Sequence, residues 1–169
     1  MRDEQRAAAL NAVSAGLVHR LAGGDVALDL PGREGAKAHG RALGRLPQLA
    51  AALGDHSDQA AEGIMTTDTH PKEIAVQFTA GGRTCTIGGI AKGSGMIHPN
   101  MGTMLCFLTT DCAISSEMIK SALLETVQVS FNRISVDGDT STNDTCCVMA
   151  NGLAGNPVIT EKGPDYDAF

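Results

Sequence analysis

Residues 73–90, EIAVQFTAGGRTCTIGGI, contain two stretches rich in β-branched and aromatic residues, Glu73–Thr79 and Thr84–Ile90. Gly81 and Gly82 separate them, and a glycine pair between two such stretches is a typical turn signal. The pattern predicts a β-hairpin, which is the clearest strand signal in the chain.

Helices are predicted on both sides of this hairpin. Apolar residues at helical spacing followed by Gly23-Gly24 predict an amphipathic helix over residues 4–22, and an Ala/Leu-rich stretch predicts a second over residues 43–53. Downstream, the apolar spacing predicts a helix over residues 116–131, with Ser115 or Ser116 as its N-cap. Residues 134–136 favour a short strand, and residues 146–151 favour the start of another helix. Together these elements predict an α+β fold.

The composition indicates one ordinary domain. The chain has 169 residues, of which 43% are hydrophobic, enough to bury a core. Thirteen basic and nineteen acidic residues give a net charge of −6, so nucleic acid and anionic membrane surfaces are not expected partners. No apolar stretch approaches the ~20 residues of a membrane span, and the charged N-terminus does not resemble a signal peptide.

Five cysteines are present, and their spacing does not predict a disulfide framework. Cys85, Cys106, Cys112, Cys146 and Cys147 form an odd set without a CxxC pair, and two of them are adjacent. We interpret them as reduced thiols of a cytoplasmic protein.

The composition changes near residue 60. Residues 1–60 contain seven basic and seven acidic residues, no Thr and no Cys, whereas residues 61–169 contain all five cysteines and fourteen Thr. The second part also carries six basic against twelve acidic residues, which is the whole net charge. Such a break is typical either of two domains or of a segment of different coding history. We interpret residues 1–60 as an atypical segment of a single domain.

Residues 91–102 predict a functional loop, because three Gly, a Pro and an Asn suit backbone that approaches another group closely. Lys92 precedes its glycines, so the loop does not match a phosphate-binding G-x-x-x-x-G-K motif. Bare N–H groups of such a loop can stabilise negative charge in acyl transfer. His98 is either a general base or a structural residue.

Asp137-Gly138-Asp139-Thr140 follows the predicted strand 134–136 and admits three interpretations. The run resembles the Asp-x-Asp start of a magnesium-dependent phosphatase. With Asn143 and Asp144 it also offers oxygen ligands to Ca2+, although it lacks the Gly and Glu of an EF-hand loop. The structural alternative, which we favour, is that these side chains accept hydrogen bonds from turn amides and cap the next helix.

Thr103 follows the small residue Gly102. If the peptide bond between them breaks, the new α-amino group of Thr103, with a pKa of about 7.7–8.0, lies beside its own hydroxyl and can act as its base. On composition alone Thr103 is unremarkable, and so is the hydroxyl-rich run that contains Thr66, Thr67 and Thr69.

Residues 62–155 resemble the ornithine acetyltransferase (ArgJ) family, also called bifunctional glutamate N-acetyltransferase. The resemblance rests on IMTTDTHPK at 64–72, on GIAKGSGMIHPNMGTML at 89–105, and on SFN at 130–132 followed by VDGDTSTNDT at 136–145 and ANG at 150–152. These motifs are long, specific and in the family's order.

The resemblance implies a fold and a chemistry. The fold is a partial layered αββα architecture similar to that of amino-terminal-nucleophile hydrolases. Self-cleavage at Gly102-Thr103 makes residues 61–102 the end of an α chain and 103–169 the start of a β chain. Thr103 is then the catalytic nucleophile that carries acetyl from N-acetylornithine to glutamate, and Thr66, Lys92 and Thr103 contact substrate. The family further implies arginine biosynthesis in the cytoplasm, an α/β heterotetramer, no metal and no cofactor, and it leaves open whether acetyl-CoA also donates acetyl.

The chain also departs from the family pattern. The family's oxyanion-hole stretch, Ser-Thr-Gly-Val-Ile-Gly, has no counterpart before Thr66, where residues 28–35 read LDLPGREG. Family members are more than twice as long. The sequence therefore leaves a second hypothesis open, that this is a truncated and catalytically inactive remnant of the family.

Overall fold

The computed structural model describes residues 57–141 and 144–169 together with 45, 47–48, 51 and 54. The helix expected over 4–22 and the segment 28–35 lie outside the described residues. Of the helix expected over 43–53, the described positions Arg45, Pro47, Gln48 and Ala51 are helical. The fold is mixed α+β, as the sequence predicts.

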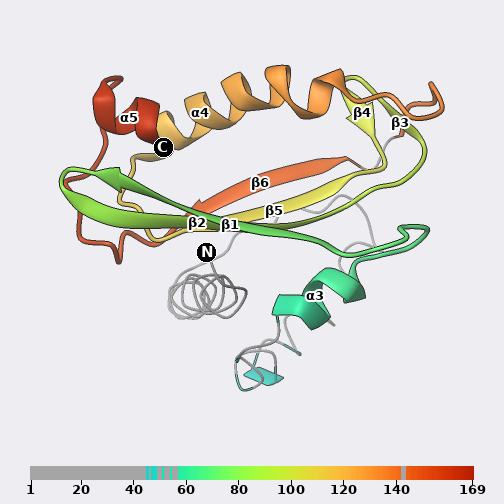
Figure 1. Cartoon of the computed structure of the whole chain (residues 1–169), viewed down its shortest axis with the longest axis horizontal. Coiled ribbons are helices and arrows are strands. Elements are labelled where there is room, and N and C mark those ends of the chain that lie inside the picture. Colours follow the sequence, from blue (N-terminus) through green and yellow to red (C-terminus); the bar gives the residue numbers. More distant parts are fainter. Residues whose placement is uncertain (1–44, 46, 49–50, 52–53, 55–56, 142–143) are drawn as a thin grey trace, which may run out of the picture.

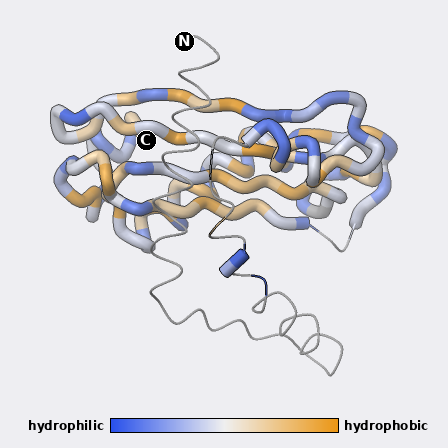
Figure 2. The backbone as a smooth tube through the Cα atoms, turned by 90° about the horizontal axis from the view of Figure 1, so that it is seen from below, coloured by the Kyte–Doolittle hydropathy of each residue, from blue (hydrophilic) through white to orange (hydrophobic). Residues whose placement is uncertain are grey.

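A four-stranded mixed sheet forms the centre, in the order β1-β2-β5-β6. It consists of β1 (Lys72–Ala80), β2 (Arg83–Lys92), β5 (Leu105–Thr110) and β6 (Thr145–Ala150). β2 pairs antiparallel with β1 on one side and with β5 on the other, and β6 pairs parallel with β5. Hydrophobic and hydrophilic stretches alternate along the described chain (Figure 2).

The predicted hairpin is confirmed as β1–β2. Lys72 pairs with Ala91 at one end and Ala80 with Arg83 at the other. Gly81 and Gly82 form the turn with φ of +54° and +72°, a conformation that glycine adopts without a Cβ clash. A Cβ at Gly81 would also lie 2.3 Å from Cδ of Pro157, so the turn packs against the C-terminal segment.

Helices lie on both sides of the sheet (Figure 1). α4 (Ser116–Val129) and α5 (Pro164–Ala168) cover one face, while α3 (Ser57–Gly63) lies toward the other. The predicted helix and N-cap are confirmed in α4, since the Ser115 side chain accepts a hydrogen bond from the Met118 backbone N–H. Phe78 of β1 packs edge-to-face on Phe169, at a centroid distance of 5.8 Å, beside a buried core that includes Cys85, Cys112 and Tyr166.

Three local predictions are wrong. Residues 146–151 do not start a helix, because Thr145–Ala150 is strand β6, and its partner β5 is not among the predicted elements. Residues 134–136 follow the 3-10 helix η1 (Phe131–Arg133) as irregular chain, since Ile134 N–H bonds to the Phe131 carbonyl. The loop expected over 91–102 contains the end of β2 and a small hairpin, β3 (Ile97–His98) with β4 (Met101–Gly102).

Candidate functional site

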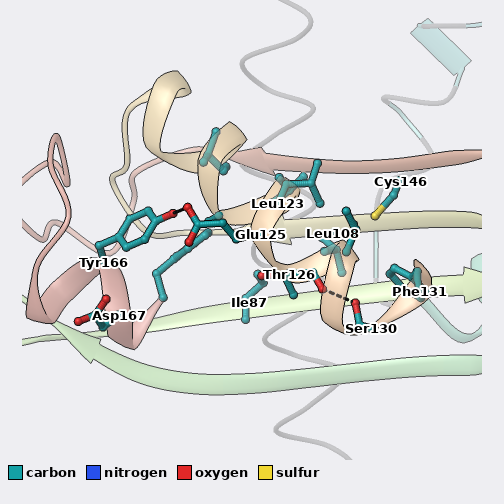
Figure 3. Close-up of a pocket in the computed structure, with 15 residues that line it drawn as sticks. Ile87, Leu108, Leu123, Glu125, Thr126, Ser130, Phe131, Cys146, Tyr166 and Asp167 are labelled. Carbon is teal, nitrogen blue, oxygen red and sulfur yellow. Dashed lines mark hydrogen bonds between the residues drawn. The ribbon is translucent and has the colours of Figure 1, made fainter. Parts of the chain in front are cut away.

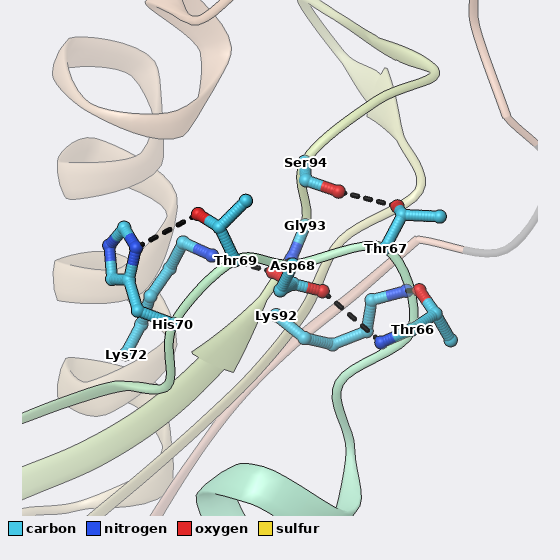
Figure 4. Close-up of polar contacts among 9 residues, drawn as sticks. All are labelled: Thr66, Thr67, Asp68, Thr69, His70, Lys72, Lys92, Gly93 and Ser94. Carbon is cyan, nitrogen blue, oxygen red and sulfur yellow. Dashed lines mark hydrogen bonds and ion pairs between the residues drawn. The ribbon is translucent and has the colours of Figure 1, made fainter.

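Thr66 and Lys92, far apart in sequence, meet beside the end of the hairpin (Figure 4). Thr66 lies in the turn after α3, and Lys92 is the last residue of β2. Lys92 Nζ donates a hydrogen bond of 2.9 Å to Thr66 Oγ1, and Lys92 is only 6% exposed. No carboxylate of the described residues forms an ion pair with this ammonium group. A buried cation normally needs an anionic partner, so the pair is suited to an anionic ligand.

Asp68 forms most of the hydrogen bonds at this corner and is not among the predicted site residues. Its Oδ1 accepts hydrogen bonds from Lys72 Nζ at 2.5 Å and from the Gly93 backbone N–H at 2.8 Å, and its Oδ2 accepts one from the Thr66 backbone N–H at 3.3 Å. The side chain is fully buried. The Lys72 hydrogen bond above all, and then the Gly93 N–H, lower the pKa of Asp68 far below its usual range. The sequence signal for this ion pair is the spacing of four residues between Asp68 and Lys72 in motif 64–72.

We name Thr66, Asp68, Lys72, Lys92 and Gly93 the Asp68 cluster. A further contact supports it, because the hydroxyl of Thr67 lies 2.5 Å from that of Ser94. The turn after α3 is thus joined to the loop after β2 by both backbone and side-chain hydrogen bonds (Figure 4). These bonds orient Thr66 toward Lys92.

The Gly102-Thr103 junction lies where the small β3–β4 hairpin leads into β5. The Thr103 backbone N–H donates to the Met96 carbonyl at 2.8 Å, and the Gly102 N–H points to Oδ2 of Asp144 at 3.4 Å. The Oγ1 atom of Thr103 is buried, and no hydrogen-bond partner for it exists among the described residues. A buried hydroxyl without a partner is costly, which is why such groups in proteins call for a functional explanation.

Gly93 connects the junction to the Asp68 cluster. An added Cβ at Gly93 would lie 3.3 Å from the Thr103 carbonyl oxygen and 3.2 Å from Cδ1 of Ile97. The Gly93 backbone therefore runs directly beside the junction while its N–H is bonded to Asp68. Of the three residues that the resemblance implies in substrate contact, the structure joins Thr66 and Lys92 directly and places Thr103 against the residue after Lys92.

Asp137 behaves as the structural interpretation predicts. Its carboxylate accepts hydrogen bonds from the backbone N–H groups of Met96 at 2.6 Å and Ile97 at 3.1 Å, with a longer one from Asp139. These amides, the Met96 N–H first, lower the pKa of Asp137. The capping part of that interpretation is wrong, because strand β6 follows and not a helix.

The metal interpretations of this run gain no support. The described part of the chain contains no group of three or more His, Cys, Asp or Glu side chains placed to hold a metal ion. Asn143, which the calcium interpretation uses, lies outside the described residues. His98 is exposed, and its ring Nδ1 lies 3.4 Å from the Ser135 hydroxyl.

The sequence that forms this site is shared with a known protein family. Residues 32–169, which include the Asp68 cluster and the junction, match the ArgJ family. The chain belongs to the ArgJ family. The ArgJ match begins within the segment 1–60 and continues to the last residue of the chain.

Curated ArgJ proteins are close relatives over part of their length. The chain is 60% identical over 110 residues to the arginine biosynthesis bifunctional protein ArgJ of Symbiobacterium thermophilum, and 57% identical over 108 residues to that of Bacillus subtilis. These alignments cover 65% and 64% of this chain and 27% of each relative. The ArgJ protein of a Synechococcus strain is 53% identical over 123 residues, covering 72% of this chain and 30% of the relative. The chain thus spans between a quarter and a third of the ArgJ relatives it matches.

Two further features of this ArgJ chain bear on the sequence predictions. All five cysteine thiols are free, as predicted. None of the described helices is long and apolar enough to cross a membrane.

Proposed function

We propose that this chain is the cleavage-junction portion of a glutamate N-acetyltransferase of arginine biosynthesis, with Thr103 as its nucleophile. The observation that carries the proposal is the buried, unpartnered Oγ1 of Thr103 directly after Gly102. A hydroxyl that makes no structural hydrogen bond is available to attack a carbonyl, and membership of the ArgJ family supports the acyl-transfer chemistry.

The first step is self-cleavage. Thr103 Oγ1 adds to the Gly102 carbonyl carbon, the C–N bond to Thr103 breaks, and an ester between Gly102 and the Thr103 oxygen results. Water hydrolyses this ester, which leaves a carboxylate on Gly102 and a free α-amino group on Thr103. Gly102 has no Cβ to obstruct the approach, and β4 holds it in place through pairing with Ile97.

The second step is acetyl transfer. The α-amino group of Thr103, with a pKa near 7.7–8.0, takes the proton of its own hydroxyl as the oxygen attacks the acetyl carbonyl of N-acetylornithine. Ornithine leaves, and the amino group of glutamate then accepts acetyl from the acetyl-Thr103 ester. Lys92 supplies the positive charge for a substrate carboxylate, and Thr66 supplies a hydroxyl held against it.

The same proposal covers the wider assembly. Residues 61–102 form the end of the α chain and 103–169 the start of the β chain, within the single, incomplete domain 1–169. The sheet with α4 on one face corresponds to one half of a layered αββα architecture. The assembly is an α/β heterotetramer of the cytoplasm that needs neither a metal nor a cofactor.

Intact-mass spectrometry of the purified chain tests the junction. We expect the parent to yield fragments 1–102 and 103–169, Thr103→Ser to yield them more slowly, and Thr103→Ala to stay uncut. A parent chain that remains whole at neutral pH while it unfolds cooperatively would contradict self-cleavage in this chain. That result would favour the catalytically inactive remnant.

Substrate turnover is tested separately. The cleaved chain is mixed with N-acetylornithine and glutamate, and N-acetylglutamate is measured by mass spectrometry. Lys92→Met should cleave like the parent but lose transfer, since the junction keeps its contacts and the carboxylate loses its cation. Equal transfer by Lys92→Met and the parent would remove Lys92 from the substrate site.

A further inference from the structure

Two thiols face each other on neighbouring strands of the sheet. Cys106 of β5 and Cys146 of β6 are direct partners in the parallel register, so their side chains leave the same face of the sheet. Neighbouring strands lie about 4.7–4.9 Å apart. A disulfide bond needs Cα atoms about 4.4–6.8 Å apart, so the backbone here already has the required spacing.

The two sulfurs interact and are not equivalent. Hydrogen bonding with the Cys106 thiol lowers the pKa of Cys146, and the same contact raises the pKa of Cys106 above its usual range. Cys146 is therefore the thiol that more readily becomes a thiolate, which is the reactive form. Cys106 is almost fully buried, at 3% exposure.

Cys146 can also be reached by a small molecule. It lines a cavity of about 340 Å³ between α4 and the sheet, together with Leu108, Leu123 and Phe131 (Figure 3). A peroxide molecule is far smaller than this space. Cys147 is no competitor for Cys106, because adjacent residues of a strand point to opposite faces.

We propose that Cys106 and Cys146 form a reversible oxidation site, in which a peroxide oxidises the two thiols to a disulfide. The Cys146 thiolate attacks one oxygen of hydrogen peroxide, which gives a sulfenic acid at Cys146 and releases hydroxide. The Cys106 sulfur then attacks the Cys146 sulfur, a disulfide forms, and the sulfenic oxygen leaves as water with the Cys106 proton. The two thiols lose two hydrogens in total, and the peroxide is reduced to two waters.

A second thiol pair provides an internal control. Cys85 and Cys112 are in contact but completely buried in the core, at 0% exposure. Burial raises the pKa of both thiols, that of Cys112 to about 12. This pair should therefore remain reduced while Cys106 and Cys146 react.

The reactive pair lies close to the Gly102-Thr103 junction. Cys106 lies three residues after Thr103, and the Thr145 N–H beside Cys146 donates to the Met104 carbonyl at 2.9 Å. A disulfide here would join β5 to β6 at the end of the sheet next to the junction.

The test is a titration of the native full chain with hydrogen peroxide, followed by thiol alkylation and tryptic mapping. We expect the loss of two free thiols from five, and a reductant-sensitive link between peptide 134–162 and peptide 93–120, or peptide 103–120 where the chain has cleaved after Gly102. Cys147→Ser and Cys112→Ser should keep the link, and Cys106→Ser and Cys146→Ser should lose it. Restoration of all five thiols by dithiothreitol completes the expected result.

Other outcomes would overturn the proposal. These are a link that persists in Cys146→Ser or disappears in Cys147→Ser, thiol loss only after the chain unfolds, or oxidation of Cys146 beyond sulfenic acid without any link. Fragmentation spectra of the linked peptides distinguish Cys106 from Cys112 and Cys146 from Cys147 in the parent chain itself, so a variant that fails to fold leaves the test decisive.

Discussion

Asp68 has a buried carboxylate and Thr103 a buried hydroxyl oxygen, both close to Gly93, and the hydrogen bonding of these two groups is opposite. The Asp68 carboxylate accepts hydrogen bonds from three donors, whereas the Thr103 hydroxyl has no partner among the described residues. A buried polar group left unpaired costs about 1–3 kcal/mol. The comparison teaches that the Asp68 carboxylate is used to join two loops, whereas the Thr103 hydroxyl makes no structural hydrogen bond, which is what its proposed role as nucleophile requires.

The strongest way to break this comparison is Asp68→Asn. The change removes the charge opposite Lys72 and weakens the bonds to Thr66 and Gly93, so we expect the free energy of unfolding to fall by roughly 1–3 kcal/mol. Cleavage at Gly102-Thr103 should slow by about 10- to 100-fold, since a displacement of ~1 Å near reacting atoms can cost that much. Denaturant unfolding and intact-mass time courses measure the two effects.

Asn156→Ala is the matched control. Asn156 is also buried, with Oδ1 accepting from the Ala113 N–H at 2.8 Å and Nδ2 donating to the Pro157 carbonyl at 2.8 Å. Its loss should lower stability by a similar amount and leave the cleavage rate of the folded chain unchanged. If both variants slow cleavage equally, Asp68 acts on cleavage only through stability.

The pH dependence of stability sharpens the same comparison. Because the folded pKa of Asp68 lies below its ordinary value of 3.8, its carboxylate stabilises the fold fully above pH 3.8. This contribution is lost as the pH falls from 3.8 toward the folded pKa. The stability difference between the parent and Asp68→Asn should stay constant from neutral pH downward and shrink below pH 3.8. A difference that widens in acid would assign the stabilisation to another group.

Gly93→Ala changes the space between the two side chains. The new Cβ meets the Thr103 carbonyl oxygen at 3.3 Å, and the φ of +155° is unfavourable for alanine. We expect a stability loss of roughly 1 kcal/mol and cleavage slowed severalfold. Gly63→Ala is the control, because nothing lies within 4 Å of its added Cβ, and it should cleave like the parent.

The smallest effect is expected from Ser115→Ala, because Ser115 caps α4 and forms no hydrogen bond with Asp68 or Thr103. The variant loses the N-cap bond to Met118 of α4 and should cost about 1 kcal/mol, seen as a lower Tm. The cleavage rate should match that of the parent. Slower cleavage at Gly102-Thr103 in this variant would show that α4 transmits strain to Thr103.

Local patterns were predicted well because their physical causes are local. The hairpin 73–90 needs a turn and two strand-forming stretches that adjoin it, and helix α4 needs an apolar spacing and the Ser115 cap. The motif residues Thr66 and Lys92 were also identified in advance, and the structure brings them together. Thr103 as nucleophile stays a prediction.

The remaining errors concern contacts between distant segments. The run Cys146–Ala150 is too short and too uniformly apolar for its period to distinguish strand from helix, and only pairing with β5 makes it a strand. Ile134–Val136 has strand-forming residues, yet the Val136 N–H finds a single bond, to the Ile97 carbonyl, and no ladder. Residue preference alone cannot supply a neighbouring strand.

By itself, the sequence determined the hairpin, the capped helix α4 and the motifs that mark the chain as ArgJ, because these depend on neighbouring residues. Only the tertiary structure decided that Asp68 would join Gly93 to the turn after α3, and that the Thr103 hydroxyl would be buried without a partner. It also placed Cys106 beside Cys146. Hydrogen bonding and burial depend on which segments meet in space, and that is settled when β2, β5 and β6 pair.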